Sequence, residues 1–112
     1  MKLSIHQQYF VQDVAKLILY ANSLGINLTG GELYRTEYQQ KEYLRTGKSK
    51  TMNSNHLRRL AVDFNFFIDN KLTYSHPLIT KLGEYWESLD PLNRWGGHFS
   101  KFNDTPHFER NV

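Results

Sequence analysis

Three polar side chains in two short segments have the types needed to bind a divalent metal ion. His56 and Asp63 lie seven residues apart in SNHLRRLAVD, and His107 follows in DTPHFE. Two imidazoles and one carboxylate supply three ligands and leave a fourth coordination position for water, which is the arrangement of catalytic zinc sites. Zinc held in this way lowers the pKa of bound water toward about 7 and polarises a scissile carbonyl. If the three residues converge, we expect a metal-dependent hydrolase.

Hydrolysis of a peptide bond also needs a group that takes a proton from the attacking water and passes it to the leaving amine. Asp104 is the candidate general base, because its position three residues before His107 keeps it close to a ligand without making it one. Pro106 should stiffen this connection. Glu109, on the same strand face as His107, is the reserve candidate for the base or for a hydrogen-bond partner of a ligand. Spacing alone is weak evidence, since a single histidine is more often a surface or hydrogen-bonded core residue.

Composition limits the alternatives. The 112 residues have the length of one domain, which we expect to span residues 1–112. The absence of cysteine excludes disulfides, thiolate zinc fingers, iron–sulfur clusters and a cysteine nucleophile. No segment approaches the ~20 apolar residues of a membrane span, so we expect no membrane partner. The N-terminal pattern is that of an amphipathic helix and not of a signal peptide, which predicts synthesis in the cytoplasm.

The net charge of +3 is a mild basic bias, and part of it is concentrated in residues 41–59. One interpretation is a nucleic-acid-binding domain built on this stretch, with salt-dependent affinity and no need for metal. A solvated basic surface is the more common outcome for such residues. The nucleic-acid interpretation also gives Asp104 and His107 no role, and we therefore expect no nucleic-acid partner.

Two helices and a strand are predicted in the first half of the chain. Each helix should begin at a capping box and end at a glycine, with the strand between them. The predicted segments are a helix from the Ser4–Gln7 capping box to Gly25, a strand over 26–35, and a helix from the Thr36–Gln39 capping box to Gly47.

The strand predicted over 60–68 explains where Asp63 would point. Apolar residues alternate along it, so that one face turns to the core. This apolar set is Leu60, Val62, Phe64, Phe66 and Ile68. Asp63 falls on the opposite face, among small or polar neighbours, as a carboxylate lining a cleft would. The polar residues 47–59 should form a loop that delivers His56 to this strand.

The remaining residues complete an α+β fold. The predicted segments are a turn at Asp69–Lys71, a hairpin strand over 71–74, a helix from a Ser75 cap to before Pro91, a loop-rich region from Leu92, and a short strand over Pro106–Arg110. Helices and strands do not alternate regularly. We therefore expect a small, mostly antiparallel sheet packed with about three helices, with the metal site in a cleft on the sheet.

Three sequence elements follow one another along the chain: Tyr34-Arg35-Thr36, then S-x-H-x-x-x-x-A-x-D from Ser54 to Asp63, then W-G-G and D-x-P-H-F-E between Trp95 and Glu109. In this order they resemble the zinc D,D-/L,D-peptidases of the M15 family, which cut peptidoglycan cross-link peptides. The family includes D-Ala-D-Ala carboxypeptidases and the L-alanyl-D-glutamate endopeptidases used as bacteriophage endolysins. The resemblance covers most of the chain from about residue 30 onward.

The resemblance implies a role for each matched residue. His56, Asp63 and His107 would bind Zn²⁺, and Asp104 would be the general base. Arg35 would orient the substrate or stabilise the developing oxyanion, for which a permanently charged guanidinium is well suited. Without the resemblance, a surface arginine paired with a neighbouring glutamate would be the simpler interpretation.

Three positions near these residues have open interpretations. The family usually has glycine where this chain has Arg59, which suggests a tight or positive-φ backbone that arginine tolerates poorly. Either the turn differs here, or the Arg59 side chain has moved to the cleft rim. Ser54 would either contact the site or cap the loop. His98 follows W-G-G and is expected at the cleft rim, not as a ligand.

We therefore expect a monomeric zinc metallopeptidase, a carboxypeptidase or endopeptidase, that acts on the peptidoglycan stem peptide and resembles phage or prophage endolysins. After release it would act in the periplasm or cell wall. The sequence leaves open which stem-peptide bond is cut. The alternative is a non-catalytic cell-wall-binding module with the peptidase fold, in which Arg59 marks lost activity.

Overall fold

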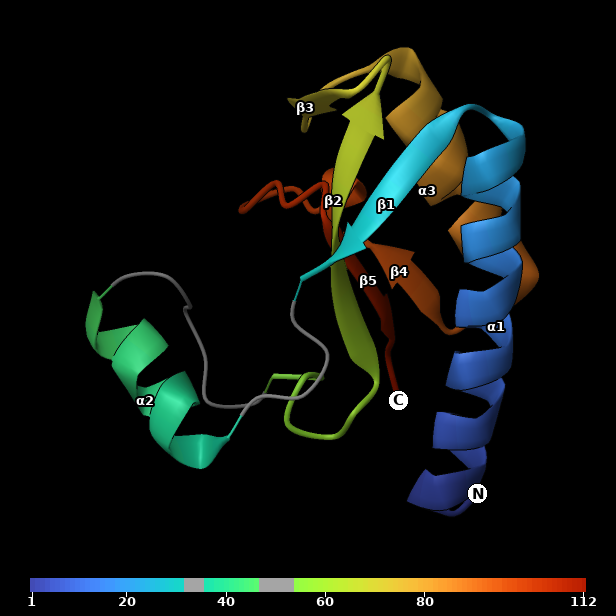
Figure 1. Ribbon diagram of the computed structural model, residues 1–112. Helices are drawn as coiled ribbons and strands as arrows, with labels where there is room; N and C mark the ends of the chain where they lie inside the picture. The colour runs from blue at the N-terminus through green and yellow to red at the C-terminus, as the bar shows by residue number, and fades with distance from the viewer. Residues whose placement is uncertain (32–35, 47–53) are drawn as a thin grey trace.

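The computed structural model describes residues 1–31, 36–46 and 54–112, which form three helices and a five-stranded antiparallel sheet (Figure 1). The α+β class predicted from the sequence is confirmed. In chain order the elements are α1 (Leu3–Ser23), β1 (Ile26–Gly30), α2 (Glu37–Thr46), β2 (Ala61–Ile68), β3 (Lys71–Thr73), α3 (Pro77–Leu89), β4 (Asn93–Trp95), a short 3-10 helix (Gly96–His98) and β5 (His107–Arg110).

Strand β2 organises the sheet because it changes partners along its length. Its C-terminal part, from Phe64 to Ile68, pairs with β1 and also with the hairpin strand β3. Its N-terminal part, from Ala61 to Asp63, pairs instead with β5, which continues to β4. The strand order is β1-β2-β5-β4, and Asp63 lies at the point where β5 joins β2.

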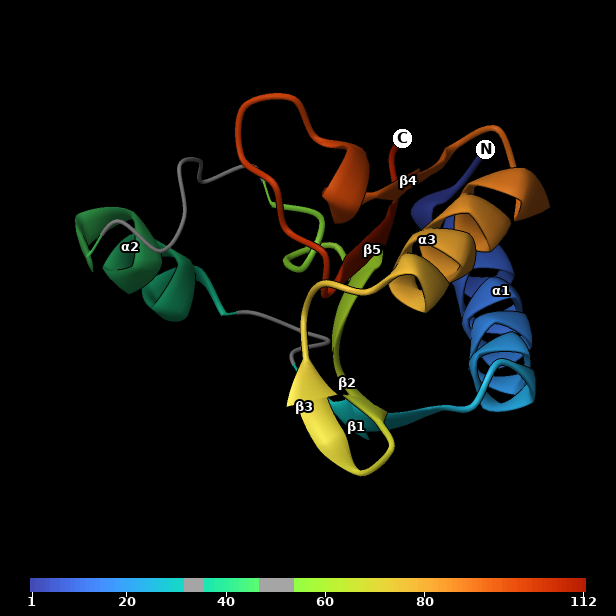
Figure 2. The same ribbon diagram turned by 90° about the horizontal axis from the view of Figure 1, so that it is seen from above.

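Helices α1 and α3 lie side by side on one face of the sheet and enclose the core with it (Figures 1 and 2). Aromatic rings dominate that core. Trp86 of α3 makes edge contacts with Phe10 of α1 and Phe108 of β5, with ring centroids 5.7 and 5.9 Å apart. Helix α2 lies apart from these two helices, on the other side of the sheet (Figures 1 and 2).

The alternation predicted for β2 is confirmed. Leu60, Val62, Phe64 and Phe66 are buried in the core with Phe108. Because side chains alternate between the two faces of a strand, Asp63 projects to the face away from α1 and α3. The core therefore also determines which face of the sheet carries the polar residues.

Several predicted element boundaries are also confirmed. Gly25, with a φ of +80°, ends α1 in the left-handed conformation that favours glycine. Thr36 Oγ1 accepts a hydrogen bond from Gln39 N at 3.1 Å, as an N-cap should. Asp69 and Asn70 have φ values of 52° and 65°, which are those of the two-residue turn that closes a β-hairpin.

Other boundaries were predicted wrongly. Helix α1 begins at Leu3 with no side-chain cap, so Ser4 and Gln7 do not form a capping box. Gln7 instead donates to the carbonyl of Arg58 at 2.8 Å, a contact distant in the sequence. The N-cap of α3 is His76 and not Ser75, since His76 Nδ1 accepts from Leu78 N at 3.1 Å. Strand β4 lies in a region predicted to be loop.

The predicted strand over 26–35 ends at Gly30 within the described residues, and residues 32–35 lie outside them. In the described part of the chain, no helix combines the length and hydropathy needed to cross a bilayer.

Candidate metal centre

The pairing of β2 with β5 places Asp63 directly opposite His107. Side chains at opposite positions of an antiparallel pair are close enough to touch. Asp63 Oδ1 lies 3.2 Å from His107 Nδ1. The pairing continues one residue further, where Phe64 N donates to the carbonyl of Pro106 at 3.0 Å. Two of the predicted ligands are thus positioned by sheet register.

A compact turn over residues 55–60 positions the third predicted ligand. Leu60 N donates to the carbonyl of Asn55 at 2.9 Å, and Arg59 N donates to the carbonyl of His56 at 3.2 Å. These two bonds, with Arg59 at a φ of 56°, make a Schellman motif, which usually has glycine at the left-handed position. The conformation expected from the family glycine is therefore present, and Arg59 adopts it.

Ser54 supports the same turn, because its Oγ accepts a hydrogen bond from His56 N at 3.2 Å. Ser54 was expected either to contact the site or to cap the loop, and this hydrogen bond is the one expected of a cap. Leu60 at the end of the turn is fully buried in the core. His56 therefore stands on a hydrogen-bonded turn anchored at both ends.

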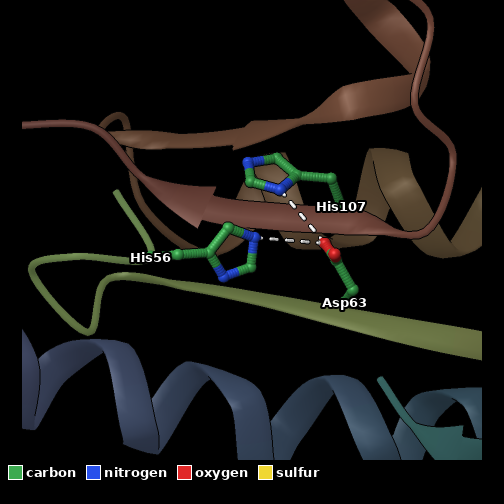
Figure 3. Close-up of side chains that lie close together, drawn as sticks. All are labelled: His56, Asp63 and His107. Carbon is green, nitrogen blue, oxygen red and sulfur yellow. Dashed lines mark hydrogen bonds and ion pairs between the residues drawn. The ribbon is translucent and has the colours of Figure 1, made fainter. Parts of the chain in front are cut away.

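The side chains of His56, Asp63 and His107 converge on one point (Figure 3). His56 Nε2 lies 3.4 Å from the same Asp63 oxygen that contacts His107, and one ligand atom from each residue lies within 4.8 Å of the others. Both imidazoles are buried, with relative exposures of 2% and 8%, whereas the Asp63 side chain is 27% exposed. The group is closed toward the core and reaches solvent beside the carboxylate.

The ligand types and the two donor separations from Asp63 fit a tetrahedral zinc ion. Zinc bonds to imidazole nitrogen and carboxylate oxygen of about 2.0–2.1 Å, at tetrahedral angles, separate neighbouring donor atoms by about 3.3–3.5 Å. The two separations from Asp63 Oδ1, 3.4 Å to His56 and 3.2 Å to His107, are close to that value. Three protein ligands also leave the fourth position open, as in catalytic sites.

The charges of the cluster are strongly coupled. Burial would raise the pKa of Asp63, but hydrogen bonds from His107 and His56 outweigh it and hold that pKa well below its usual range. Burial would also disfavour a charged His107, yet its hydrogen bonds to Asp63 and Glu109 raise the pKa of His107 to about 9. Without a metal, His107 is therefore a buried cation at neutral pH, and a bound metal ion must replace its Nδ1 proton.

Glu109 lies beside the cluster and is engaged on both carboxylate oxygens. Its Oε1 lies 2.7 Å from His107 Nε2, and its Oε2 accepts from Arg94 Nη2 at 2.7 Å and from Asn55 Nδ2 at 2.8 Å. Burial opposes ionisation of Glu109, but His107 and Arg94 outweigh it and lower the pKa. With 7% of its side chain exposed, Glu109 is placed as a partner of His107 and not as a base that meets substrate.

The W-G-G motif holds the segment that carries Asp104. Asp104 N donates to the carbonyl of Gly96 at 2.9 Å, and His107 N donates to the carbonyl of Asp104 at 3.1 Å. A Cβ added to Gly96 would lie 2.1 Å from the Asp104 carbonyl oxygen, so no larger residue fits there. This contact fixes the main chain of Asp104 in the turn before His107. Asp104 is half-buried and does not belong to the metal-ligand group.

Arg35 and His98 complete the residues singled out in the sequence. Arg35 falls outside the described residues. His98 is not in the metal-ligand group, because its Nδ1 lies 2.7 Å from Glu87 Oε1 and its ring meets Trp95 edge-on. The side chain of His98 is 44% exposed, which agrees with its predicted place outside the ligand set.

Sequence reasoning missed Asn55 and Arg94, the two partners of Glu109 Oε2. Arg94 belongs to β4, which was predicted to be loop, and faces Glu109 across the β4–β5 pair. A prediction of β4 would have placed these two charges opposite each other. Asn55 precedes His56 directly, but nothing in its residue type indicates a bond to a residue more than fifty positions away.

Comparisons with known proteins identify the family. A family model described as D-alanyl-D-alanine carboxypeptidase matches residues 47–110, more than half of the chain. The L-alanyl-D-glutamate peptidase of Listeria phage A118 is 32% identical over 97 residues, which are 86% of this chain and 34% of that protein. The chain thus spans about a third of the length of this relative.

A solved structure has the same fold. The L-Ala D-Glu endopeptidase ChiX of Serratia marcescens superimposes with a TM-score of 0.76 at 22% identity, covering 91% of this chain and 77% of that chain. The fold and the family match agree, and the family match includes all three residues of the candidate metal centre. The chain belongs to the M15 family of peptidases.

Proposed function

We propose that this peptidase uses zinc, held by His56, Asp63 and His107, to hydrolyse the L-alanyl-D-glutamate bond of the peptidoglycan stem peptide. The observation that carries the proposal is the convergence of two imidazoles on one carboxylate, with a nitrogen of each ring 3.2–3.4 Å from the same Asp63 oxygen. When bound, zinc supplies Lewis acidity, which polarises a scissile carbonyl and makes water a stronger acid.

The chain itself supplies the remaining functions. In this proposal the Asp104 carboxylate takes a proton from the attacking water and delivers it to the leaving amine. The main chain of Asp104 is held by Gly96 and by the turn to His107, which keeps the base beside a ligand. Arg35 orients a substrate carboxylate or stabilises the oxyanion through its fixed N–H donors.

The choice of bond is supported by the relatives. The phage A118 protein is named an L-alanyl-D-glutamate peptidase. The second candidate is the terminal D-alanyl-D-alanine bond, which is supported by the description of the family model. Each bond is followed by a residue with a free carboxylate, D-glutamate in the first and the terminal D-alanine in the second, so the proposed role of Arg35 is compatible with both.

The alternative of a non-catalytic cell-wall-binding module is not favoured. It rested on Arg59 as a mark of lost activity. The turn around Arg59 keeps the left-handed conformation of a Schellman motif, and His56 within that turn meets Asp63. The substitution therefore gives no reason to expect loss of the site.

Digestion of purified peptidoglycan tests the proposal. We expect the wild-type protein to release new L-alanine carboxyl ends and D-glutamate amino ends, a metal chelator to stop the release, and added zinc to restore it. Free D-alanine in place of those ends would assign the second bond. Digestion that continues in the chelator would overturn the metal assignment. Binding to peptidoglycan without any new ends would favour the non-catalytic module.

A further inference from the structure

A buried carboxylate joins the two segments that carry the histidines. Glu109 Oε1 lies 2.7 Å from His107 Nε2, on the opposite side of the ring from Asp63. Glu109 Oε2 accepts a hydrogen bond from Asn55, the residue before His56, and two more from Arg94. The carboxylate that accepts these hydrogen bonds is buried, since Glu109 is only 5% exposed.

An ionised carboxylate only accepts hydrogen bonds, and this determines which ring nitrogen keeps its proton. His107 Nε2 must carry a hydrogen to satisfy Glu109 Oε1 at 2.7 Å. The neutral ring then has its lone pair on Nδ1, the atom that lies 3.2 Å from Asp63 Oδ1. That lone pair points into the group of donors and is the one available to a metal ion.

We propose that Glu109 is a positioning residue that holds His107 in the tautomer with hydrogen on Nε2 and, through Asn55, holds the turn of His56 against β5. The inference rests on the proposed metal site and names no contact between Glu109 and substrate. Residues that hydrogen-bond the far nitrogen of a ligating histidine commonly set its orientation and basicity.

Glutamine cannot replace this carboxylate, although it has the same shape. Its side-chain amide has one accepting oxygen and one donating nitrogen. Arg94 and Asn55 present three N–H donors to the Oε2 position, so the amide oxygen must turn toward them. The amide NH₂ then faces His107 Nε2 and favours the tautomer with hydrogen on Nδ1. In that tautomer Nδ1 has no lone pair for a metal ion.

Zinc affinity, measured by competition with a chromophoric chelator, tests the inference. We expect Glu109→Gln to bind zinc about 10–100-fold more weakly than the wild type, the range typical for such partners of a ligand. The matched control is Asp90→Asn, which breaks the 2.9 Å ion pair of buried Arg110, the next residue on β5. This control should lose stability yet keep its zinc affinity within about twofold, because Arg110 does not contact the cluster. Equal zinc affinity of wild type and Glu109→Gln would overturn the inference.

The ring protons provide a readout that does not depend on affinity. Long-range proton–nitrogen correlation spectra of the metal-free protein, recorded above the titration of His107, should show hydrogen on Nε2 in the wild type and on Nδ1 in Glu109→Gln. The same tautomer in both proteins would contradict the inference even if both bind zinc. The wild type could instead bind no zinc while its His107 tautomer still differs from that in Glu109→Gln. That result would refute the proposed function and support the positioning role.

Discussion

Asp63 and His107 are direct neighbours across two antiparallel strands, and their side chains meet at 3.2 Å. A shift of one residue in the register of β2 would turn Asp63 toward α1 and α3 and its apolar neighbours toward solvent. The burial of Val62 and Phe64 therefore opposes any such shift. The same alternation that builds the core thus also fixes this half of the candidate metal centre.

Metal content should depend on each residue of the cluster. We expect about one zinc per chain in the wild type and almost none in His107→Ala or His56→Ala, because two remaining ligands bind too weakly. His98→Ala is the matched control, since His98 pairs with Glu87 outside the cluster and its loss should leave zinc content unchanged. Metal analysis after gel filtration measures this. Full zinc content in His107→Ala would remove His107 from the ligand set.

The stability of the metal-free protein should fall as pH rises from 6.5 to 9. The pKa of His107 is raised from 6.5 to about 9 by its hydrogen bonds to Asp63 and Glu109, which outweigh burial. A raised histidine pKa contributes stability that is complete below the unfolded value and is lost as pH approaches the folded value. The loss should be on the order of 2–3 kcal/mol.

Urea denaturation of chelator-treated protein at pH 6 and pH 9 measures this loss. In His107→Gln the difference between the two pH values should largely disappear, because the titrating ring is absent. Equal wild-type stability at both pH values would show that His107 is not held as a cation.

Sequence patterns predicted the part of the site that depends on regular structure. The alternation in β2 gave the direction of Asp63, and the spacing in D-x-P-H-F-E placed Glu109 on the same face as His107. Strand periodicity is a local property, so it can be read from a few residues. The family glycine suggested a positive φ at position 59 but left open whether this chain keeps that turn, and Arg59 has a φ of 56°.

Long-range hydrogen bonds could not be predicted in this way. Gln7 fitted a capping box but donates to the carbonyl of Arg58, far along the sequence. Asn55 and Arg94 meet at Glu109 only because the turn over 55–60 and strand β4 both lie beside β5. Such contacts depend on tertiary packing, which outweighs weak local preferences.

Gly96 should be essential for the position of the segment before His107. In Gly96→Ala, the new Cβ would lie 2.1 Å from the carbonyl oxygen of Asp104 and 3.0 Å from the Cβ of His107. Backbone must move to relieve the first contact, at a cost of about 1–3 kcal/mol. We expect weaker zinc binding as well, because the displaced segment carries His107. Gly30→Ala is the control, since nothing lies within 4 Å of its added Cβ. Thermal unfolding and zinc titration of both variants check this, and equal behaviour would contradict it.

Arg59→Gly should be more stable than Arg59→Ala. Arg59 has a φ of 56°, where a residue with a Cβ is disfavoured by roughly 1–2 kcal/mol and glycine is not. The greater freedom of glycine in the unfolded chain reduces the gain to roughly 0.5–1 kcal/mol. Arg59→Ala is the matched control, because it removes the side chain but keeps the Cβ. Chemical denaturation should find Arg59→Gly more stable than Arg59→Ala, and the reverse order would show that the turn is not strained.

Asp104→Asn separates catalysis from metal binding. Asp104 is not in the ligand group, so the variant should bind zinc as the wild type does. Loss of the carboxylate removes the proposed proton acceptor, and hydrolysis of peptidoglycan should fall by about 10²–10⁴-fold. Asp69→Asn, in the β2–β3 hairpin, changes the same group away from the site and should keep full activity. If Asp104→Asn keeps both zinc and activity, the base must be another group. Glu109 would be a poor substitute, because its two oxygens are already bound to His107, Arg94 and Asn55.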